Sequence, residues 1–350
     1  MRPSSAAILP SRDEPETIAA VTAAVDAALD DPHAVIVHAD ASDHSETAAR
    51  FTATPTRARK ISLTGLPRGK GTQILHALPH LPDPTGALLI TDTDTRNPDA
   101  DLYRALLAHA DSGYAIADYP RYWDEGNLTS HLARPLIAAT TGHDVPQPLA
   151  GDLALCAGII NAVRTADAAL PPRLATAVNG YGIDAFLLLT AAAVGPITTV
   201  PASCPKQHAA SFPHLPQIYD EAVPILLALA ANAPAPPAPR TRPPRYRPAD
   251  RHLTPDQQAF MLTALDRLAP RSSRYDARPW PLPLVDAWHA VKTGVLPNDA
   301  ARTLRPHYVH RVRLWLTATW TTAERADILT DAHTRLITEL ADHPVWSHTP

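Results

Sequence analysis

The sequence predicts an α/β fold: a mostly parallel sheet flanked by helices, followed by a helical region at the C-terminus. In the first half, short apolar runs alternate with alanine-rich stretches of helical spacing, the pattern of a parallel sheet covered by helices. Beyond a proline-rich segment, every periodic stretch has helical spacing. Because proline interrupts helices and strands, residues 234–249 are expected to be a linker between a first domain at 1–233 and a helical region at 250–350.

Each expected strand is a short run of apolar, often β-branched residues. The strands are expected at 6–9, 34–38, 60–63, 87–91 and 114–118. In an open α/β sheet, ligands bind beyond the carboxyl ends of the strands. The loops that follow these strands are therefore where a functional site is expected.

Helices are expected where apolar residues recur at helical spacing and where Ser, Thr, Asp or Pro lies near the start. They are expected at 16–29, 45–51, 72–78 and 99–110, and beyond the linker at 254–268, 283–292, 298–304 and 323–340. Trp288, Trp315 and Trp320 are expected to anchor the packing of the later helices.

Composition excludes several classes of protein. The 350 residues carry a formal net charge of −4, with 45% hydrophobic and 19% charged residues, which is typical of a globular protein and gives no basic field for nucleic acid. The only cysteines, Cys156 and Cys204, make neither a disulfide framework nor a CxxC metal pair. No apolar run approaches the ~20 residues of a membrane span, and the N-terminus lacks the pattern of a signal peptide. A cytoplasmic protein is expected.

One apolar strand runs directly into Asp92-Thr93-Asp94. Two carboxylates on either side of one residue can share a hard divalent cation, whose remaining positions are free for phosphate oxygens and water. A solvated loop, or a helix N-cap at Asp94, explains the triplet as well. Its place at the end of a strand favours a Mg²⁺ or Mn²⁺ site that holds a diphosphate.

Two glycines enclose a lysine, Gly69-Lys70-Gly71, between an expected strand and the next helix. The spacing is not that of a P-loop, because Gly65 and Gly69 enclose three residues and a glycine follows the lysine. Two interpretations stay open. The segment is either a tight turn with an exposed lysine, or a backbone that approaches a ligand closely while Lys70 neutralises its phosphate.

The loops after the first two strands carry acidic residues. Pro10, Asp13 and Glu14 follow the first strand, and Asp40 follows the second. These carboxylates can accept hydrogen bonds from a base or a ribose hydroxyl. Alternatively, Asp13 and Glu14 cap the next helix, where the helix dipole favours negative charge.

Later loops beside apolar elements carry further polar residues, as is typical of loops that line a site. They contain Arg121 and His131, Gly151 and Asp152, Tyr181 and Asp184, and Lys206 and His208. Asp184 can equally cap the helix expected at 185–193. His208 is one of 17 histidines, most of which are expected at the surface.

In their order along the chain, these motifs resemble nucleotide-sugar glycosyltransferases of the GT-A fold. The resemblance rests on P-x-x-D-E-x-x-T-I, H-A-D-x-S, G-K-G-T, D-T-D, G-D-L, G-Y-G-I-D and K-x-H, and covers roughly residues 6–231. The pattern is most similar to glucosyl-3-phosphoglycerate synthase and mannosylglycerate synthase, retaining enzymes that transfer a hexose to a glycerate-type acceptor. The helical C-terminal region resembles the extensions of that group more loosely.

The resemblance implies roles for these residues and Mg²⁺ or Mn²⁺ as the cofactor. It implies a donor site of Pro10, Glu14, Asp40, Gly69, Lys70, Asp92, Thr93 and Asp94, a metal site of Asp94, His208 and Asp92, and an acceptor site of Arg121, Gly151, Asp152, Tyr181 and His131. Asp94 is the firmer metal ligand in this scheme. Asp184, Asp152 and Lys70 are the candidate catalytic residues.

The implied reaction is electrostatic, because the cation and Lys70 stabilise negative charge on the departing nucleoside diphosphate. In a retaining reaction on one face of the sugar, the leaving phosphate takes the acceptor's proton, so no protein base is required. Asp184 and Asp152 would orient the acceptor or the sugar hydroxyls. Arg121 and His131 would bind an anionic acceptor, since a guanidinium matches a carboxylate or phosphate bidentately.

The chain departs from the family pattern at two places. Asp13-Glu14-Pro15 stands where the family usually has Asn-Glu-Glu, and Ala41 where it has Asn, so the donor base stays open. A sugar nucleotidyltransferase is disfavoured, because the loop after the first strand lacks the glycine-rich motif of that class. The alternative is a noncatalytic nucleotide-sugar-binding protein of the same fold. Members of the family are often dimers; the C-terminal helices either supply such an interface or fold back on the first domain.

Overall fold

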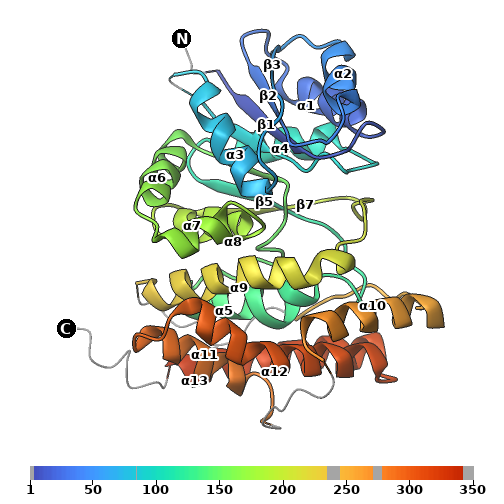
Figure 1. Cartoon of the computed structure of the whole chain (residues 1–350), viewed down its shortest axis with the longest axis vertical. Helices are drawn as coiled ribbons and strands as arrows, with labels where there is room; N and C mark the ends of the chain where they lie inside the picture. The colour runs from blue at the N-terminus through green and yellow to red at the C-terminus, as the bar shows by residue number, and fades with distance from the viewer. Residues whose placement is uncertain (1–3, 84, 235–244, 271–277, 342–350) are drawn as a thin grey trace. The chain divides into compact units, whose positions relative to one another are not determined.

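The computed structural model describes residues 4–83, 85–234, 245–270 and 278–341 (Figure 1). The chain divides into two compact units. The first comprises Met1–Tyr119 and Leu149–Ala209, and the second comprises Pro120–Pro148 and Ala210–Pro350. This division differs from the expected boundaries, because each unit is built from two separate stretches. Of the expected linker, residues 235–244 lie outside the described residues.

The described strands of the first unit form one seven-stranded sheet in the order β3-β2-β1-β4-β6-β5-β7. They are β1 (Ala6–Ser11), β2 (Val35–Asp40), β3 (Arg59–Leu63), β4 (Leu88–Ile90), β5 (Tyr114–Asp118), β6 (Leu153–Leu155) and β7 (Ile197–Pro201). Neighbouring strands pair in parallel except at β6, which is antiparallel to both β4 and β5. The predicted mostly parallel sheet is confirmed.

Helices make the central strands of this sheet inaccessible to water. Every residue of β1 and β2 is buried, as is typical of parallel strands covered on both faces. The helices of the first unit are α1 (Ile18–Leu29), α2 (Glu46–Ala53), α3 (Lys70–Ala77), α4 (Ala100–His109), α6 (Ala157–Ala168), α7 (Pro172–Val178) and α8 (Gly182–Ala192), with a short 3-10 turn η1 (Leu78–His80). Helix α4 begins at a side-chain cap, since Asp99 accepts hydrogen bonds from the backbone of Asp101 and Leu102.

The described part of the second unit is mainly helical. It contains the π-helical turn η2 (Thr129–Ala133), α5 (Arg134–Thr141), the 3-10 turn η3 (Phe212–His214), α9 (Leu215–Asn232), α10 (Pro255–Leu268), α11 (Leu282–Lys292), α12 (Pro297–Thr317) and α13 (Thr322–Ala341). Helix α9 packs against α11 and α12, and α5 packs against α13. Trp288 and Trp315 are fully buried, which confirms two of the three predicted anchors, whereas Trp320 is half-buried.

Several element predictions were wrong or incomplete. The helix expected at 298–304 continues as α12 to Thr317, because Pro306 lies within the helix instead of ending it. The sequence also did not predict β6, β7, α6, α7 and α9, whereas a helix containing His131 and Arg134 was expected and is found as η2 with α5. Strand β6 has only three residues, too few for a periodic signal, and Pro224 interrupts the pattern of α9.

Within the described residues, no single helix has the length and apolar composition to cross a membrane. One sharply bent pair, α7 with α8, passes that test only when its two members are taken together.

Candidate active site

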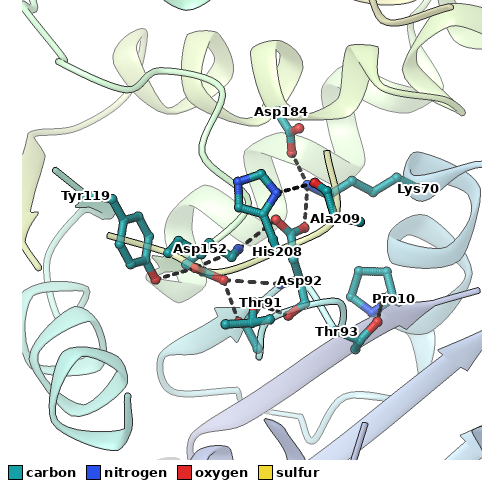
Figure 2. A network of polar contacts seen from close by, with 12 residues as sticks. Pro10, Lys70, Thr91, Asp92, Thr93, Tyr119, Asp152, Asp184, His208 and Ala209 are labelled. Atoms are coloured by element: carbon teal, nitrogen blue, oxygen red, sulfur yellow. Dashed lines mark hydrogen bonds and ion pairs between the residues drawn. The ribbon is translucent and has the colours of Figure 1, made fainter. Parts of the chain in front are cut away.

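Asp92, directly after β4, lies at the centre of a chain of alternating charges in the first unit (Figure 2). Its Oδ1 lies 2.9 Å from Lys70 Nζ, and its Oδ2 lies 2.9 Å from Lys206 Nζ. Lys70 Nζ also lies 2.8 Å from Asp184 Oδ1, and Lys206 Nζ lies 2.9 Å from Asp152 Oδ2. Five charged side chains from distant parts of the sequence therefore form one network.

The network sets the charges of its members. Burial disfavours the charged form of Asp92, but Lys206 and Lys70 outweigh burial and hold the pKa of Asp92 well below its usual range. Burial likewise opposes the charge of Lys70, yet Asp184 and Asp92 raise the pKa of this lysine. Asp184 differs, because burial raises its pKa to about 6 despite the neighbouring Lys70. Asp92 and Lys70 are therefore a charged pair at neutral pH.

Asp152 is fully buried and binds other members of the network through both of its oxygens. Its Oδ1 accepts hydrogen bonds from Thr91 Oγ1 at 2.5 Å and from the backbone N–H of Asp92 at 3.2 Å. Its Oδ2 accepts one from Tyr119 Oη at 2.5 Å, beside the ion pair with Lys206. Both oxygens are thus occupied by the protein in this structure, and Asp152 positions Asp92 and Lys206. The expected contact of Asp152 with a substrate stays a prediction.

Gly151 lies directly against the carboxylate of Asp92. A Cβ at this position would come within 2.1 Å of Asp92 Oδ2 and 2.2 Å of Asp92 Oδ1. Only glycine leaves room for the carboxylate in this place. The residue predicted as part of the acceptor site therefore has a clear function in packing.

The Gly69-Lys70-Gly71 segment is shaped by close packing of α3 against the turn between α7 and α8. A Cβ on Gly71 would lie 1.8 Å from the carbonyl oxygen of Val178, and one on Gly69 would lie 2.3 Å from that of Asn179. Gly69 also has a φ of +133°, which favours glycine. This packing brings Lys70 beside the first turn of α8. The lysine side chain is 15% exposed, so it is not the freely exposed lysine of a surface turn.

Two further carboxylates, Asp94 and Glu14, lie near one another beside the network. Burial raises the pKa of Glu14 to about 7, and the nearby charge of Asp94 adds to this increase. Burial and the charge of Asp92 raise the pKa of Asp94 in turn. Neither residue caps a helix, since Thr17 precedes α1 and Asp99 caps α4. A cation stabilises neighbouring half-buried carboxylates of this kind.

His208 also suits a metal ion. Its Nδ1 lies 2.6 Å from the carbonyl oxygen of Ala209, so Nδ1 carries the hydrogen and Nε2 keeps its lone pair (Figure 2). The ring lies close enough to Asp94 that a positive charge on it would lower the pKa of that carboxyl, against the larger effect of burial. No group of three His, Cys, Asp or Glu that could hold a metal occurs in the described part of the chain. The side chains fit a cation held by Asp94 and His208, with ligand oxygens or water completing its shell.

The role of Asp92 as a third metal ligand stays a prediction. In this structure each of its two oxygens pairs with a lysine, Lys70 on one side and Lys206 on the other. Asp92 thereby orients the two lysines.

Hydrogen bonds join the loops after β1 and β2, where a donor nucleoside was expected. Asp40 Oδ1 accepts hydrogen bonds from Ser42 N at 3.0 Å, Ser42 Oγ at 2.5 Å and Ser11 Oγ at 3.2 Å. Asp13 has a left-handed φ of 57°, and its Oδ1 accepts a hydrogen bond from Asp43 N at 3.0 Å. The two loops are thus fixed to one another, and Asp40 is buried.

Behind these loops lies a buried histidine. His38 Nε2 lies 2.5 Å from Ser11 Oγ, and His38 Nδ1 lies 3.2 Å from Ser62 Oγ. Burial lowers the pKa of His38 to about 4. The imidazole is therefore neutral at physiological pH and serves as a hydrogen-bonding link between β1, β2 and β3.

Pro10 and Thr93 hold the loop after β4 in place. Thr93 Oγ1 donates a hydrogen bond to the carbonyl oxygen of Pro10 at 2.8 Å, and the carbonyl oxygen of Thr93 accepts one from Thr17 Oγ1 at 2.6 Å. Both Pro10 and Thr93 are buried. The Thr93 hydroxyl, predicted to contact the donor, is instead used within the protein.

Arg121 and His131 lie in the second unit, whereas the other predicted site residues lie in the first. Arg121 Nε donates a hydrogen bond to Gln147 Oε1 at 2.7 Å. The His131 side chain is buried, with its ring edge toward Trp315 and the ring centroids 4.8 Å apart. The acceptor roles expected for Arg121 and His131 stay predictions.

Sequence reasoning did not assign a role to three members of the network, Lys206, Tyr119 and Thr91. The only signal for Lys206 was its place two residues before His208. Its pairing with Asp92, 114 residues away, is set by the fold and has no local pattern.

Comparison with solved structures identifies the fold, whereas no protein-family model and no curated protein matches the chain. Glucosyl-3-phosphoglycerate synthase from Mycobacterium tuberculosis, in complex with phosphoglyceric acid, matches with a TM-score of 0.51 and 21% identity, over 66% of this chain and 81% of that chain. The same enzyme in complex with Mn²⁺ and UDP-glucose matches with a TM-score of 0.51 and 21% identity, over 66% and 80% of the two chains. A structure described as a mycobacterial protein matches with a TM-score of 0.51 and 20% identity, over 71% of this chain and 80% of that chain.

At such identities the likeness concerns the fold. The mixed sheet flanked by helices is that of the glucosyl-3-phosphoglycerate synthase structures, which confirms the predicted fold class: the chain has a GT-A fold.

Proposed function

We propose that the protein is a metal-dependent glycosyltransferase. It transfers a hexose from a nucleoside-diphosphate sugar to a small anionic acceptor of glycerate type, with retention of configuration. The observation that carries this proposal is the pairing of Lys70 with Asp92 and Asp184 beside Asp94, directly after β4 of a GT-A fold. Support comes from glucosyl-3-phosphoglycerate synthase, which shares this fold and has been solved with Mn²⁺, UDP-glucose and phosphoglyceric acid.

The donor diphosphate is bound on the side of Lys70. The lysine carries its positive charge at neutral pH, because Asp184 and Asp92 outweigh its burial and raise its pKa. A fixed cation in a half-buried position stabilises charge more strongly than one in water. Lys70 therefore stabilises the negative charge that develops on the departing nucleoside diphosphate.

Asp94 and His208 would hold Mg²⁺ or Mn²⁺, which supplies further positive charge at the diphosphate when bound. The hydrogen bond from His208 Nδ1 to Ala209 fixes the tautomer that leaves Nε2 free. Glu14 lies near Asp94 and keeps the local charge negative when both are ionised. The loops after β1 and β2, with Asp40, bind the base and the ribose.

Asp184 faces the sugar and the acceptor. Its pKa of about 6 leaves it mostly ionised at neutral pH, and its Oδ1 is held by Lys70. The carboxylate orients a hydroxyl by accepting its hydrogen bond. The acceptor's proton passes to the leaving phosphate, so no side chain of this chain is required as a general base. Tyr181, which precedes α8, lies on the acceptor side of Asp184 in this scheme.

The test is binding and turnover by the full chain. Calorimetry with UDP, GDP, ADP and their hexose conjugates, each with Mn²⁺, Mg²⁺ or EDTA, should show one base bound selectively and only with metal. Incubation of that donor with glycerate or phosphoglycerate should give a hexosyl product whose anomeric coupling constant equals that of the donor.

The matched variants are Asp94→Asn and Asp101→Asn. Asp101 is an exposed aspartate on α4 whose carboxylate, within the described residues, forms an ion pair with Arg104 of the same helix. D94N should abolish the metal-dependent part of binding while D101N binds as the wild type. Donor binding without turnover, with any acceptor, would favour the noncatalytic binding protein, and equal binding by D94N and wild type would remove the metal assignment.

A further inference from the structure

A buried guanidinium without a carboxylate partner lies in the second unit. Arg311 is on α12, and its Nη2 is buried with no hydrogen-bond partner. The hydrogen bond that the structure gives it runs from Nε to His131 Nδ1, at a long 3.4 Å. Burial lowers the pKa of Arg311 to about 10, and no acidic group of the described residues offsets this effect. Burying a guanidinium without counter-charge is costly, so such a group calls for an anion.

The neighbouring imidazole also has an unused polar atom. Since His131 Nδ1 accepts the hydrogen of Arg311 Nε, the hydrogen of the ring itself is on Nε2. Nε2 is buried and has no hydrogen-bond partner, and His131 as a whole is 1% exposed. Burial, Arg311 and Arg325 lower the pKa of His131 far below its usual value. The neutral ring therefore contributes donors and acceptors but no charge to balance Arg311.

The surroundings add positive charge. Arg325 is buried, with its guanidinium 3.7 Å from the ring centroid of Trp123 and 4.8 Å from that of Trp315. Its hydrogen bonds go to neutral carbonyl oxygens, at 2.5 Å for Trp315 and 2.9 Å for Ala318. Two guanidinium groups thus act on His131, and neither forms an ion pair within the described residues. Burial lowers the pKa of Arg325, and the more distant Asp250 and Asp124 offset this effect only in part.

The acidic residues of this region are held elsewhere. Asp124 and Glu125 both pair with Arg251, through Nη2 and Nη1 respectively. Their charge is therefore used by a third arginine. The field at Arg311 and His131 favours an anion.

We propose that Arg311 and His131 form a binding site for an oxyanion, either a carboxylate or a phosphate group. The Nε and Nη2 hydrogens lie on one edge of a guanidinium, the edge that grips two oxygens at once. Here this edge has one long contact and one unused donor. An oxyanion replaces the long contact by two charge-assisted hydrogen bonds from Arg311, and His131 donates to it when the ring hydrogen is on Nδ1 instead of Nε2. Arg311 is partly exposed as a residue, whereas its Nη2 is buried, so an anion enters only when this side chain moves.

The proposal does not rest on glycosyl transfer, although it includes His131, which the resemblance placed at the acceptor site. The residues proposed for donor and metal binding all lie in the first unit, whereas Arg311 and His131 lie in the second. Lys70→Met removes the cation proposed for the donor diphosphate and leaves Arg311 unchanged. Anion binding that survives in K70M and is lost in Arg311→Met therefore belongs to the second unit, whatever the outcome for glycosyl transfer.

The experiment measures thermal stability and calorimetric binding of the full chain in inorganic phosphate and in acetate, each against chloride of equal ionic strength. The phosphate and acetate arms distinguish the two oxyanions. A ligand that binds only the folded chain raises its melting temperature. We expect a rise in the wild type and in K70M. In Arg311→Met, which keeps the length of the side chain but no charge, binding should weaken by at least about tenfold.

Two further readouts separate a ligand site from a structural one. Without added anion, R311M should melt no lower than the wild type, because it removes a buried charge that lacks a partner. If R311M does not fold, Arg311→Lys keeps the charge without the two-pronged edge and should weaken phosphate binding at least threefold. Arg335→Met, at an exposed arginine of α13, is the control and should respond as the wild type. Equal responses of wild type and R311M or R311K, or no response of the wild type to either anion, overturn the proposal.

Discussion

Gly151 and Asp92 are packed so closely that a single methyl group on Gly151 would overlap both carboxylate oxygens of Asp92, at 2.1 and 2.2 Å. The backbone of one residue thereby fixes the carboxylate of the other. Because Asp92 also receives both lysines of the network, its position determines where the positive charges of the site lie.

Gly151→Ala is therefore expected to displace Asp92 and Lys70 together. A misplacement of about 1 Å can cost about 100-fold in rate, so glycosyl transfer should fall by about that factor while the protein still folds. The control is Gly195→Ala, where the nearest atom to a Cβ lies at an ordinary 3.9 Å. The measurement is the steady-state rate of glycosyl transfer by both variants. A fully active G151A would show that the position of Asp92 is unimportant for the reaction.

Lys206→Met should destabilise the fold. The lysine side chain is 5% exposed and pairs with both Asp92 and Asp152. Its removal leaves the buried Asp152 without a counter-charge and leaves Asp92 paired with Lys70 alone. Breaking one side of a buried ion pair typically costs about 3–5 kcal/mol. The free energies of unfolding of the wild type, K206M, Asp152→Asn and the double variant, measured by urea denaturation, form a double-mutant cycle. We expect D152N to recover part of the loss in the K206M background, and strict additivity of the two substitutions would contradict the pairing.

Gly71→Ala and Gly158→Ala should change stability in opposite directions. A Cβ on Gly71 would lie 1.8 Å from the carbonyl oxygen of Val178, so α3 must move away from that turn, at a cost of about 1–3 kcal/mol or more. A Cβ on Gly158, inside α6, would lie 3.8 Å from the nearest atom, and alanine gains up to about 1 kcal/mol in helix propensity. Denaturation midpoints test the pair. G71A as stable as the wild type would contradict the close packing of α3.

Stability should depend on pH through His38. Its pKa is about 4 in the folded chain, lowered by burial from the ordinary value of 6.5. The folded state thus favours the neutral ring, and this contribution is complete above pH 6.5 and is lost as the pH falls through 4. The shift corresponds to about 3 kcal/mol at most. Across this range His38→Gln should lose less of its unfolding free energy than the wild type, and parallel pH profiles of the two would refute the assignment.

The sequence predicted the parts of this structure that have local signals. Asp92 and Asp94 stood out because they follow a buried strand, and both lie where they were expected, at the end of β4. Lys70 stood out between its glycines, although the glycines serve packing against Val178 and Asn179.

The features that the sequence did not predict depend on contacts between residues that are far apart along the chain. The partners of Asp92 come from 22 residues upstream at Lys70 and 114 residues downstream at Lys206, and no spacing rule connects them. Whether Thr93 points its hydroxyl at a ligand or at Pro10 is decided by where β1 lies beside β4. The sequence likewise did not indicate how the chain divides into two units. Residues 120–148 interrupt the first unit without a long proline-rich segment like that at 234–249.

Strand β6 runs antiparallel to its neighbours β4 and β5. Its first residue, Leu153, therefore lies at the carboxyl ends of both, where it pairs with Ile90 and Ile116. Gly151 and Asp152 therefore lie in the loop that leads into β6, whereas Asp92 and Tyr119 lie in the loops that follow β4 and β5. A single reversed strand lets the chain place an incoming and an outgoing loop in direct contact. For sheets of this kind, candidate site residues should be sought before reversed strands as well as after parallel ones.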